Sequence, residues 1–552
     1  MASRRDELNA YSFARKRTNA AFLKPLPNGS IESAPKPLKA VVPSIIMGVL
    51  MLVGFGACGI LKPVAPSGWD EVGKNVIVGD ESTTRYIVLN TKDANGNNQK
   101  LLHPILNLAS ARLLLDPKFQ VVKVKESELD GKIPHGPAIG IPFAPDRLPS
   151  ADDADKPKTW AVCNRPGTGA DSKPQQAVFV LAGKDKQLVD DTRKGKLDFR
   201  QALYVEDPDG KKWLVDYNGM AFEFNSTAAG WQPPGGREQG DNDLRRIIFG
   251  AKAEPQKVSQ QFMDTLLKVP SVMAISMPMV QGAGSQTNNT EVPAKARTVG
   301  SILEDSDGQK YVVEKDGIEQ VTNFVAKLLS EGPNAQKVNP SSNAALDVVQ
   351  VAKGSFHPKP DVTGNGYSTF LGKVPGTSID SPWPSEAVTA ANDFTQDAQT
   401  SGLGGTTKSG VACSVYKGTD RKYPGGEEKQ LGYPNGVPEM QTWVGDDYPA
   451  KIASGASSYV TPGSGLLYTE VATPKAKNGS LFLVTDTGLR YLIPRNNDSA
   501  TKAGSDKEEV DKARLHLGYG GTHPPLILKA WSSLLSNGPV LDIRSAKKPQ
   551  SS

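Results

Sequence analysis

The chain has 552 residues, of which 38% are hydrophobic, and a formal net charge of +5. This length predicts several domains or one array of repeats, and the 54 glycines and 42 prolines are typical of a loop-rich globular protein, which excludes a wholly disordered chain. The positive charge lies in the first forty residues, which carry eight lysines and arginines and three acidic residues. The near-neutral remainder therefore argues against nucleic acid as a partner.

Residues 1–40 form a basic tail with some helical periodicity. Arg15, Lys16 and Arg17 would lie on one side of a helix, opposite an apolar side. The apolar positions are Leu8, Tyr11, Phe13, Ala14, Phe22 and Leu23. Two interpretations stay open, an amphipathic helix against the inner leaflet or another protein, and a solvated tail that only sets topology. The stretch 25–37 is expected to be a flexible connector.

Residues 41–61 contain no charged side chain over 21 positions. At about 1.5 Å of rise per residue, a helix of this length covers roughly the 30 Å of hydrocarbon in a bilayer. The flank that follows carries only Lys62 and Lys74 among its first twenty residues, with four acidic residues. Because positive charge stays in the cytoplasm, we expect a single-pass protein with a cytoplasmic N-terminus and the rest outside, in the periplasm.

Two other interpretations of this segment compete with a membrane helix. A cleaved signal peptide would have a shorter basic region and an apolar core of about 7–15 residues. The run that ends at Cys58 has a faint likeness to a lipoprotein processing site, but Phe55 stands where leucine is usual and the tail is long. A membrane-spanning helix over 41–61 fits better than either.

Cys163 and Cys413 are the only cysteines after the apolar segment. Outside the cytoplasm an even pair predicts a disulfide, although two unpaired buried thiols remain the alternative. A bridge would close a loop of about 250 residues, which the loop-entropy model values at roughly 5 kcal/mol.

A strand–turn–strand pattern recurs along the chain after the apolar segment. Turn residues such as Asn-Gly, Asp-Gly and Thr-Gly stand between alternating apolar runs, and these dipeptides tolerate the positive φ of tight hairpins. The four predicted hairpins span residues 85–105, 211–224, 309–322 and 480–493.

Short apolar helices follow these hairpins. Residues 247–250 and 262–267 correspond to residues 515–518 and 529–535, because Gly250 and Gly518 and the leucine pairs after them share one offset of 268 residues. Further helices are predicted over 324–329 and 107–114. Self-similarity of this kind indicates structural repeats.

The predicted architecture is α+β, with four small α/β repeats around a central β-rich domain that is linked by Cys163 and Cys413, in an elongated periplasmic region. The central domain is assembled from two separate segments, residues 117–185 and 346–470. The other boundaries are a cytoplasmic tail 1–40, a transmembrane helix 41–61, a first repeat 75–116, a second repeat 186–271, a third repeat 296–345 and a fourth repeat 471–545.

The sequence predicts no catalytic residues, metal site or cofactor. Five histidines show no metal-ligand spacing, and no G-x-S-x-G elbow occurs. These histidines are His103, His135, His357, His516 and His523. Gly68, Gly73 and Lys74 give a partial phosphate-loop pattern, but Asn75 replaces the magnesium-binding hydroxyl and acidic residues occupy the loop, so Lys74 is a weak nucleotide candidate.

Several motifs together resemble the EccB component of actinobacterial type VII (ESX) secretion systems. The likeness runs from the basic tail to about residue 545. The runs that carry it are VIVGD (76–80), LLHPILNLASARLL (101–114), PHGPAIGIPFAPDRLP (134–149), WAVC (160–163), RTVGSILEDSDGQKYVVEKDGIEQVTNFVAKLL (297–329) and GVACSVY (410–416).

The resemblance implies a core subunit of an inner-membrane complex, alongside the EccC ATPase, EccD and EccE. It implies one membrane helix and periplasmic repeats similar to a phage-lysin cell-wall-binding fold, with self-association through the periplasmic region. It also implies a disulfide between Cys163 and Cys413. Nucleotide hydrolysis has been suggested for the family, which gives no catalytic residues to transfer.

Three functions follow as hypotheses. The leading one is a structural subunit that organises the periplasmic side of a protein-export channel in the plasma membrane. The second is a membrane-anchored module that binds the cell wall through its repeats. The third is an extracytoplasmic protein that binds or hydrolyses ATP at Lys74.

Overall fold

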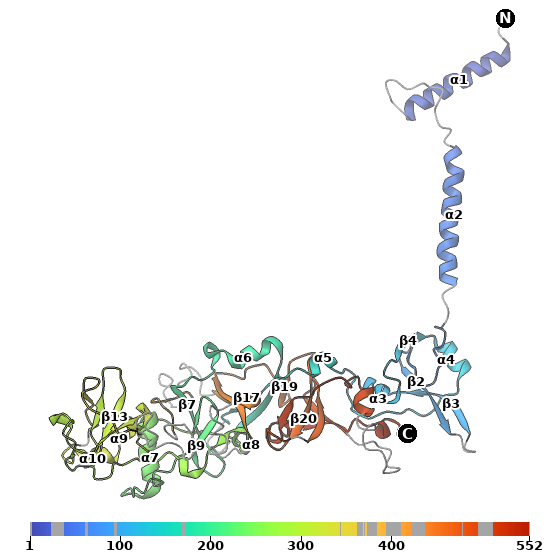
Figure 1. The fold of residues 1–552 in the computed structure, drawn as a ribbon. Helices are drawn as coiled ribbons and strands as arrows, with labels where there is room; N and C mark the ends of the chain where they lie inside the picture. The colour runs from blue at the N-terminus through green and yellow to red at the C-terminus, as the bar shows by residue number, and fades with distance from the viewer. Residues whose placement is uncertain are drawn as a thin grey trace. The chain divides into compact units, whose positions relative to one another are not determined.

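The structure is a computed structural model of the whole chain (Figure 1). It describes residues 3–23, 38–60, 65–92, 97–167, 173–342, 344–360, 368, 370–371, 383–392, 410–421, 436–476, 478–494 and 512–550. The chain divides into two units, the first made of residues 1–69, 78–83 and 122–132 and the second of the remainder.

The first unit is mainly helical. It contains α1 (Arg4–Leu23), α2 (Leu38–Ile60) and α4 (Glu126–Lys132). α1 confirms that the basic tail contains a helix, and its apolar side chains Leu8, Tyr11 and Phe22 are exposed. Among the helices of the described residues, none has the length and apolar character needed to cross a membrane. The membrane span expected over residues 41–61 stays a prediction.

The first sheet has the strand order β3-β2-β1-β4. Its strands are β1 (Asn75–Gly79), β2 (Arg85–Lys92), β3 (Asn98–Pro104) and β4 (Gln120–Val124). α3 (Leu108–Leu114) begins where the side chain of Asn107 accepts a hydrogen bond from the backbone N–H of Ser110, at 3.0 Å. Such a cap satisfies a donor that the first turn leaves free, so it explains why the helix starts there.

The second and third sheets lie next in the chain. The second has the order β10-β7-β8-β9-β11, with β16 also paired to β7, and the third has the order β14-β13-β12-β15. The strands are β7 (Gln201–Glu206), β8 (Lys212–Asp216), β9 (Met220–Glu223), β10 (Gln256–Lys257), β11 (Leu267–Lys268), β12 (Ile302–Glu304), β13 (Lys310–Val313), β14 (Ile318–Val321), β15 (Val349–Gln350) and β16 (Thr389–Ala390). Their helices are α7 (Gly236–Phe249), α8 (Gln260–Thr265), η4 (Ser271–Met273), η5 (Ala294–Ala296), α9 (Asn323–Glu331) and α10 (Pro333–Val338). α7 and α9 bury Leu244 and Leu328 in one apolar cluster, which joins the two sheets.

The last sheet has the order β23-β20-β21-β22-β24. Its elements are β20 (Leu466–Val471), β21 (Ser480–Val484), β22 (Leu489–Ile493), α11 (Lys512–His516), β23 (Leu526–Leu528), α12 (Lys529–Ser532), β24 (Ser536–Asn537) and α13 (Ile543–Ala546). α13 lies beside α3, although hundreds of residues separate them in the chain (Figure 1). Ala109 and Leu113 of α3 share an apolar cluster with Leu541 and Ala546.

One turn design recurs in these sheets. In the turns that begin at Asp207, Asp216 and Asp305, a carboxylate oxygen accepts hydrogen bonds from the backbone N–H groups two and four residues later. A glycine with positive φ follows three residues after each aspartate, and Gly488 stands three residues after Thr485 in the same way. These glycines are Gly210, Gly219, Gly308 and Gly488, with φ between 77 and 79°. A side chain at this φ would be strained, so the glycine is required by the turn.

A five-stranded central sheet has the order β18-β17-β5-β6-β19. Its strands are β5 (Thr159–Arg165), β6 (Gln175–Leu181), β17 (Val411–Arg421), β18 (Val437–Gly445) and β19 (Ser458–Val460). Short helices flank it, namely α5 (Ala151–Ala154), η2 (Gly183–Lys186), α6 (Gln187–Asp190) and η3 (Thr192–Lys194).

The mixed α/β class and the four hairpins are confirmed, since β2–β3, β8–β9, β13–β14 and β21–β22 are antiparallel neighbours. Three strands in the range 346–470 belong to other sheets than the central one, because β15 pairs with β12, β16 with β7 and β20 with β21. The four-repeat architecture and its boundaries stay a prediction.

Candidate functional site

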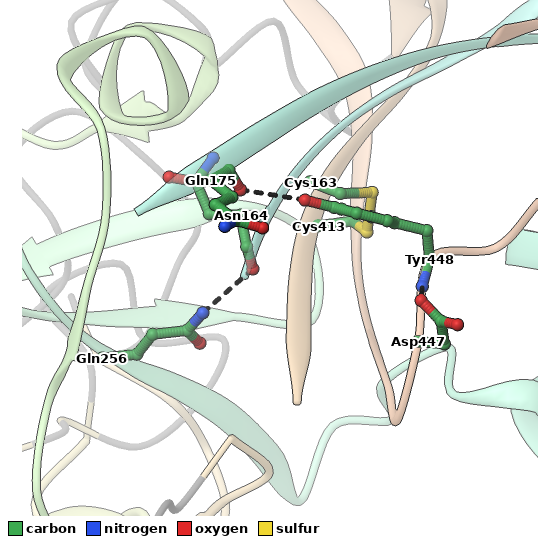
Figure 2. Close-up of a disulfide and its surroundings, with 7 residues drawn as sticks. All are labelled: Cys163, Asn164, Gln175, Gln256, Cys413, Asp447 and Tyr448. Carbon is green, nitrogen blue, oxygen red and sulfur yellow. Dashed lines mark hydrogen bonds between the residues drawn. A yellow bond between two sulfur atoms is a disulfide. The ribbon is translucent and has the colours of Figure 1, made fainter. Parts of the chain in front are cut away.

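The centre of the candidate site is the pairing of β5 with β17 in the central sheet. The two strands are antiparallel, and Cys163 and Cys413 are direct partners in the register. Their Cα atoms are 4.0 Å apart and their sulfur atoms are bonded (Figure 2). Both side chains are fully buried, in an apolar cluster with Phe179 and Trp443. The bond therefore joins two segments that are 250 residues apart in the chain.

Tyr448 covers this cluster from the loop after β18. Its hydroxyl donates a hydrogen bond to the backbone oxygen of Gln175 at 3.0 Å, and its backbone N–H donates to the Asp447 carboxylate at 2.7 Å (Figure 2). The guanidinium of Arg165 lies 4.5 Å from the centre of its ring and pairs with Asp447. Burial raises the pKa of the Tyr448 hydroxyl. The tyrosine thus holds the loop across the end of β5 and the start of β6.

A buried polar network joins the central sheet to the second sheet. The side chain of Gln256, in β10, donates to the backbone oxygen of Asn164 in β5 at 3.0 Å (Figure 2). The amide of Asn392 donates to the side-chain oxygen of Gln256 at 3.1 Å and also pairs with the backbone of Tyr204 in β7. The side chains of Gln256 and Asn392 are at most 2% exposed. Since an unpaired buried amide costs free energy, the network fixes one arrangement of the two sheets.

Asp153 joins the central sheet to the last sheet. Its carboxylate accepts from the hydroxyl of Ser464 at 2.7 Å and the backbone N–H of Gly465 at 2.8 Å, just before β20. Lys158, which leads into β5 and is almost fully buried, donates to it at 2.8 Å. Burial alone would raise the pKa of Asp153, but these three donors outweigh it and hold the pKa below its ordinary value. The carboxylate is therefore kept charged to hold this junction together.

Apolar packing connects the same three sheets. One buried cluster contains Trp160 and Tyr416 of the central sheet, Leu203 of β7 and Tyr468 of β20. The Tyr416 ring stacks on Trp531 of α12 with ring centres 5.4 Å apart, and its hydroxyl donates to the backbone oxygen of Leu526 at 3.0 Å. This packing is suited to fix the positions of the three sheets relative to one another, which is a structural role.

Lys74 lies in the second unit, far in the chain from the disulfide strands. Its ammonium is 3.5 Å from the carboxylate of Asp116, and its backbone N–H donates to Glu71. The N–H of Gly73 donates to Val88 at 2.9 Å. The backbone N–H of Lys118 and the nearby Lys74 hold the pKa of Asp116 below its ordinary value. A phosphate loop needs free N–H groups, and here these N–H groups already have partners.

The rings of three histidines form hydrogen-bond contacts within the fold. His103 is buried and its ring contacts Thr91 at 3.2 Å and the backbone oxygen of Pro137 at 2.9 Å. His357 pairs with Glu291, and His516 contacts the backbone oxygen of Leu115. Across the described residues no group of three or more His, Cys, Asp or Glu side chains is placed to hold a metal ion.

Sequence reasoning missed the polar junctions. Asn164, Gln256, Asn392 and Asp153 lie in segments without a recognisable motif, and their partners are distant in the chain. A single amide or carboxylate has no spacing signal, so no sequence pattern could have found them. The pairing of Cys163 with Cys413 could be predicted from the sequence because the chain has only three cysteines.

Comparisons with known proteins give one consistent family. The family described as type VII secretion system ESX-1, transport TM domain B, matches residues 1–377 and 407–550. The chain is 26% identical to the ESX-3 secretion system ATPase EccB3 of Mycobacterium tuberculosis (strain ATCC 25618 / H37Rv), over 92% of this chain and 82% of that protein. It is 27% identical to the ESX-1 secretion system ATPase EccB1 of Mycolicibacterium smegmatis (strain MKD8), over 58% of this chain and only 60% of the relative.

A solved structure has a similar fold. The structure of the periplasmic assembly from an ESX-5 inner membrane complex contains a chain that is 18% identical, with a TM-score of 0.50. The match covers 89% of this chain and 99% of that one. At this identity the likeness concerns the fold alone.

The disulfide generates a stability prediction. Cys163→Ser with Cys413→Ser should lower the unfolding midpoint in urea and the free energy of unfolding by roughly 2–5 kcal/mol, because the unfolded chain is released from a closed loop of 250 residues and gains conformational entropy. The matched control is the oxidised parent, whose mobility on a non-reducing gel should change on reduction while that of the double variant does not. An unchanged midpoint would show that the bridge does not stabilise this fold.

Proposed function

The chain belongs to the EccB family of the type VII secretion system, and we propose that it serves there as a membrane-anchored structural subunit that organises the periplasmic side of the export channel. The observation that carries the proposal is the central sheet, whose disulfide, polar network and apolar cluster hold three sheets together. A subunit that positions partners needs such fixed junctions. The partners in this proposal are the EccC ATPase, EccD and EccE, together with further copies of the chain.

α2 is proposed as the single membrane span, with α1 in the cytoplasm. Between Val42 and Val53 the large apolar side chains of α2 are all more than half exposed, which in water would be unfavourable and in lipid would be favourable. Arg15, Lys16 and Arg17 lie in α1, on the N-terminal side of this segment. Positive charge on that side favours a cytoplasmic tail.

The topology can be tested with two cysteine variants in a Cys58→Ser background. Ser12→Cys in α1 should react with a membrane-impermeant maleimide only after the membrane is permeabilised. Ser533→Cys, which replaces an exposed residue after α12, should react in intact cells or spheroplasts. Labelling of the two positions in the opposite order would contradict the proposed topology, and equal labelling of both in sealed cells would contradict a membrane between them.

Phe143 is proposed as an anchor for self-association. Its side chain is 90% exposed, and its φ of 61° lies in the left-handed region, which costs a residue with a Cβ about 1–2 kcal/mol. The surrounding loop is firmly held, because Asp146 pairs with Arg85 and accepts from the backbone N–H of Leu108 at 2.9 Å. A rigid loop that keeps an aromatic ring in water gains free energy when a second copy covers that ring.

Native gels of detergent extracts test this anchor. Phe143→Asp should shift the protein from its assembled band to a smaller species, because a carboxylate cannot be buried in an apolar contact without cost. Val272→Asp is the matched control, since Val272 is 78% exposed in η4 and should leave the band unchanged. Phe143→Gly should also weaken assembly while it relieves the backbone. An unchanged band in both Phe143 variants would rule this loop out.

The subunit is proposed to act without hydrolysing nucleotide, although its relatives bear the name ATPase. The support is local, because Lys74 and its loop already use their charges and N–H groups within the fold. Lys74→Ala should leave any ATP turnover of the purified chain unchanged, and loss of turnover in this variant alone would revive the nucleotide hypothesis. Lys123→Ala, which removes an exposed lysine 3.9 Å from Asp80, is the control for charge.

A further inference from the structure

Two sequence runs that resemble the EccB family, residues 101–114 and 134–149, come together at the start of α3. Asn107 caps this helix, and its amide also donates a hydrogen bond to the backbone oxygen of Ile141 at 2.7 Å. The hydroxyl of Ser110 accepts from the backbone N–H of Ile141 at 2.8 Å and donates to the Asn107 side-chain oxygen at 2.7 Å. Two side chains at the helix start therefore bind both backbone groups of one residue. This pair is called the Asn107–Ser110 clamp below.

The clamp is a closed and buried network. Asn107 is 5% exposed, Ser110 is fully buried, and Ile141 is 3% exposed. Because water does not reach these groups, the loss of one bond leaves a buried polar group without a partner. The network therefore favours a single position of Ile141 relative to α3.

Ile141 is the first residue of the tight turn that carries Phe143. The backbone N–H of Ala144 donates to the Ile141 oxygen at 3.2 Å. Pro142 and Phe143 are therefore the two central residues of the turn. Proline is common at the first central position, whereas a positive φ at the second normally requires glycine. Phenylalanine stands there with a φ of 61°, and the oxygen that closes the turn is the atom that Asn107 binds.

Other contacts hold the two ends of this loop. Before the turn, the side chain of Gln550 donates to the backbone oxygen of Gly140 at 2.7 Å. After the turn, the Asp146 carboxylate accepts from the backbone N–H of Leu108 at 2.9 Å. These bonds fix the entry and the exit of the loop, whereas the clamp acts on the residue that closes the turn.

We propose that Asn107 and Ser110 are positioning residues for Phe143, because they hold the turn in the conformation that presents its ring to a second copy of the chain. This inference rests on the proposed self-association through Phe143, whose side chain is 90% exposed. Without the clamp, a turn with phenylalanine at positive φ moves toward a less strained conformation. A ring with a fixed position binds more tightly than a mobile one, because less conformational entropy is lost on association.

Asn107→Asp separates the clamp from the helix cap. Aspartate still accepts from the N–H of Ser110, so α3 should be retained, but it has no N–H to donate to Ile141. In the full-length chain in detergent, hydrogen exchange of the backbone N–H groups of residues 141–146 should become roughly tenfold faster, while exchange in residues 111–114 stays unchanged. Equal acceleration in the loop and in α3 would show that the variant affects the cap, and it would overturn the proposal.

Asn289→Asp is the matched control for the added charge. The side-chain oxygen of Asn289 also accepts from a backbone N–H two residues later, that of Glu291, at 2.9 Å. This variant should leave exchange in residues 141–146 unchanged. Ser110→Ala removes the other half of the clamp without adding charge, and it should accelerate exchange in the loop in the same way as Asn107→Asp.

Phe143→Gly tests whether the clamp opposes backbone strain. A Pro-Gly turn adopts positive φ without strain, so Asn107→Asp should accelerate loop exchange by a smaller factor in the Phe143→Gly background than in the parent. A residue that only supports the fold would give the same factor in both backgrounds. Equal factors, or no acceleration by either clamp variant, would therefore overturn the proposal.

Self-association of the same variants is measured by sedimentation equilibrium in detergent. Asn107→Asp and Ser110→Ala should weaken it roughly tenfold, and Asn289→Asp should leave it unchanged. Unchanged association in both clamp variants, with weaker association in Phe143→Asp, would overturn the positioning role and leave the anchor intact. Unchanged association in Phe143→Asp would refute the anchor itself, whereas the exchange measurement decides separately whether the clamp holds the turn.

Discussion

The pairing of β5 with β17 is the constraint on which the rest of the second unit depends. The two cysteines are 250 residues apart, and the second and third sheets lie between β6 and β17 in the chain, as an insertion between two parts of the central sheet. The ends of that insertion can be held together only if the central sheet closes. The disulfide makes the closure covalent, and the complete burial of both sulfur atoms keeps it out of contact with solvent.

Closure of the central sheet also creates the surfaces on which its neighbours pack. Asn164 immediately follows Cys163 in β5, so the strand that carries the disulfide also offers the backbone oxygen that Gln256 binds. Trp160 and Tyr416 are register partners on the same two strands, and both enter the cluster with Tyr468 and Trp531 of the last sheet. Breaking one strand pair would therefore loosen two neighbouring sheets together. This coupling explains why a protein of many small sheets does not need a large core in each of them.

Local chemistry decided which regions of this fold were predictable from the sequence. The Asp-x-x-Gly turn at Asp216 dictates a tight hairpin by itself, since the aspartate and the glycine satisfy the turn within a few residues. The same turn at Asp305 joins β12 to β13 and lies outside the predicted hairpins. Thr322 likewise caps α9, two residues before Phe324, where the helix is predicted to start. The assignment of β15 and β16 was not predictable, because each has only two residues and pairs parallel with a strand far away in the chain. The polar junctions at Asn392 and Asp153 were not predictable either, because their hydrogen-bond partners are also far away in the chain.

Several ionisable groups of the described chain have fixed partners within the fold. Asp153 is held by Lys158 and Ser464, Asp216 and Asp305 close turns, and Lys74 faces Asp116. A carboxylate whose lone pairs are occupied by fixed donors is a poor base, and an ammonium group beside a carboxylate is a poor phosphate ligand. The groups that the fold leaves exposed are of another kind, namely the apolar side chains of α2 and the ring of Phe143. Such groups gain free energy by being covered rather than by transferring protons, and a protein with this distribution is suited to hold other molecules in place.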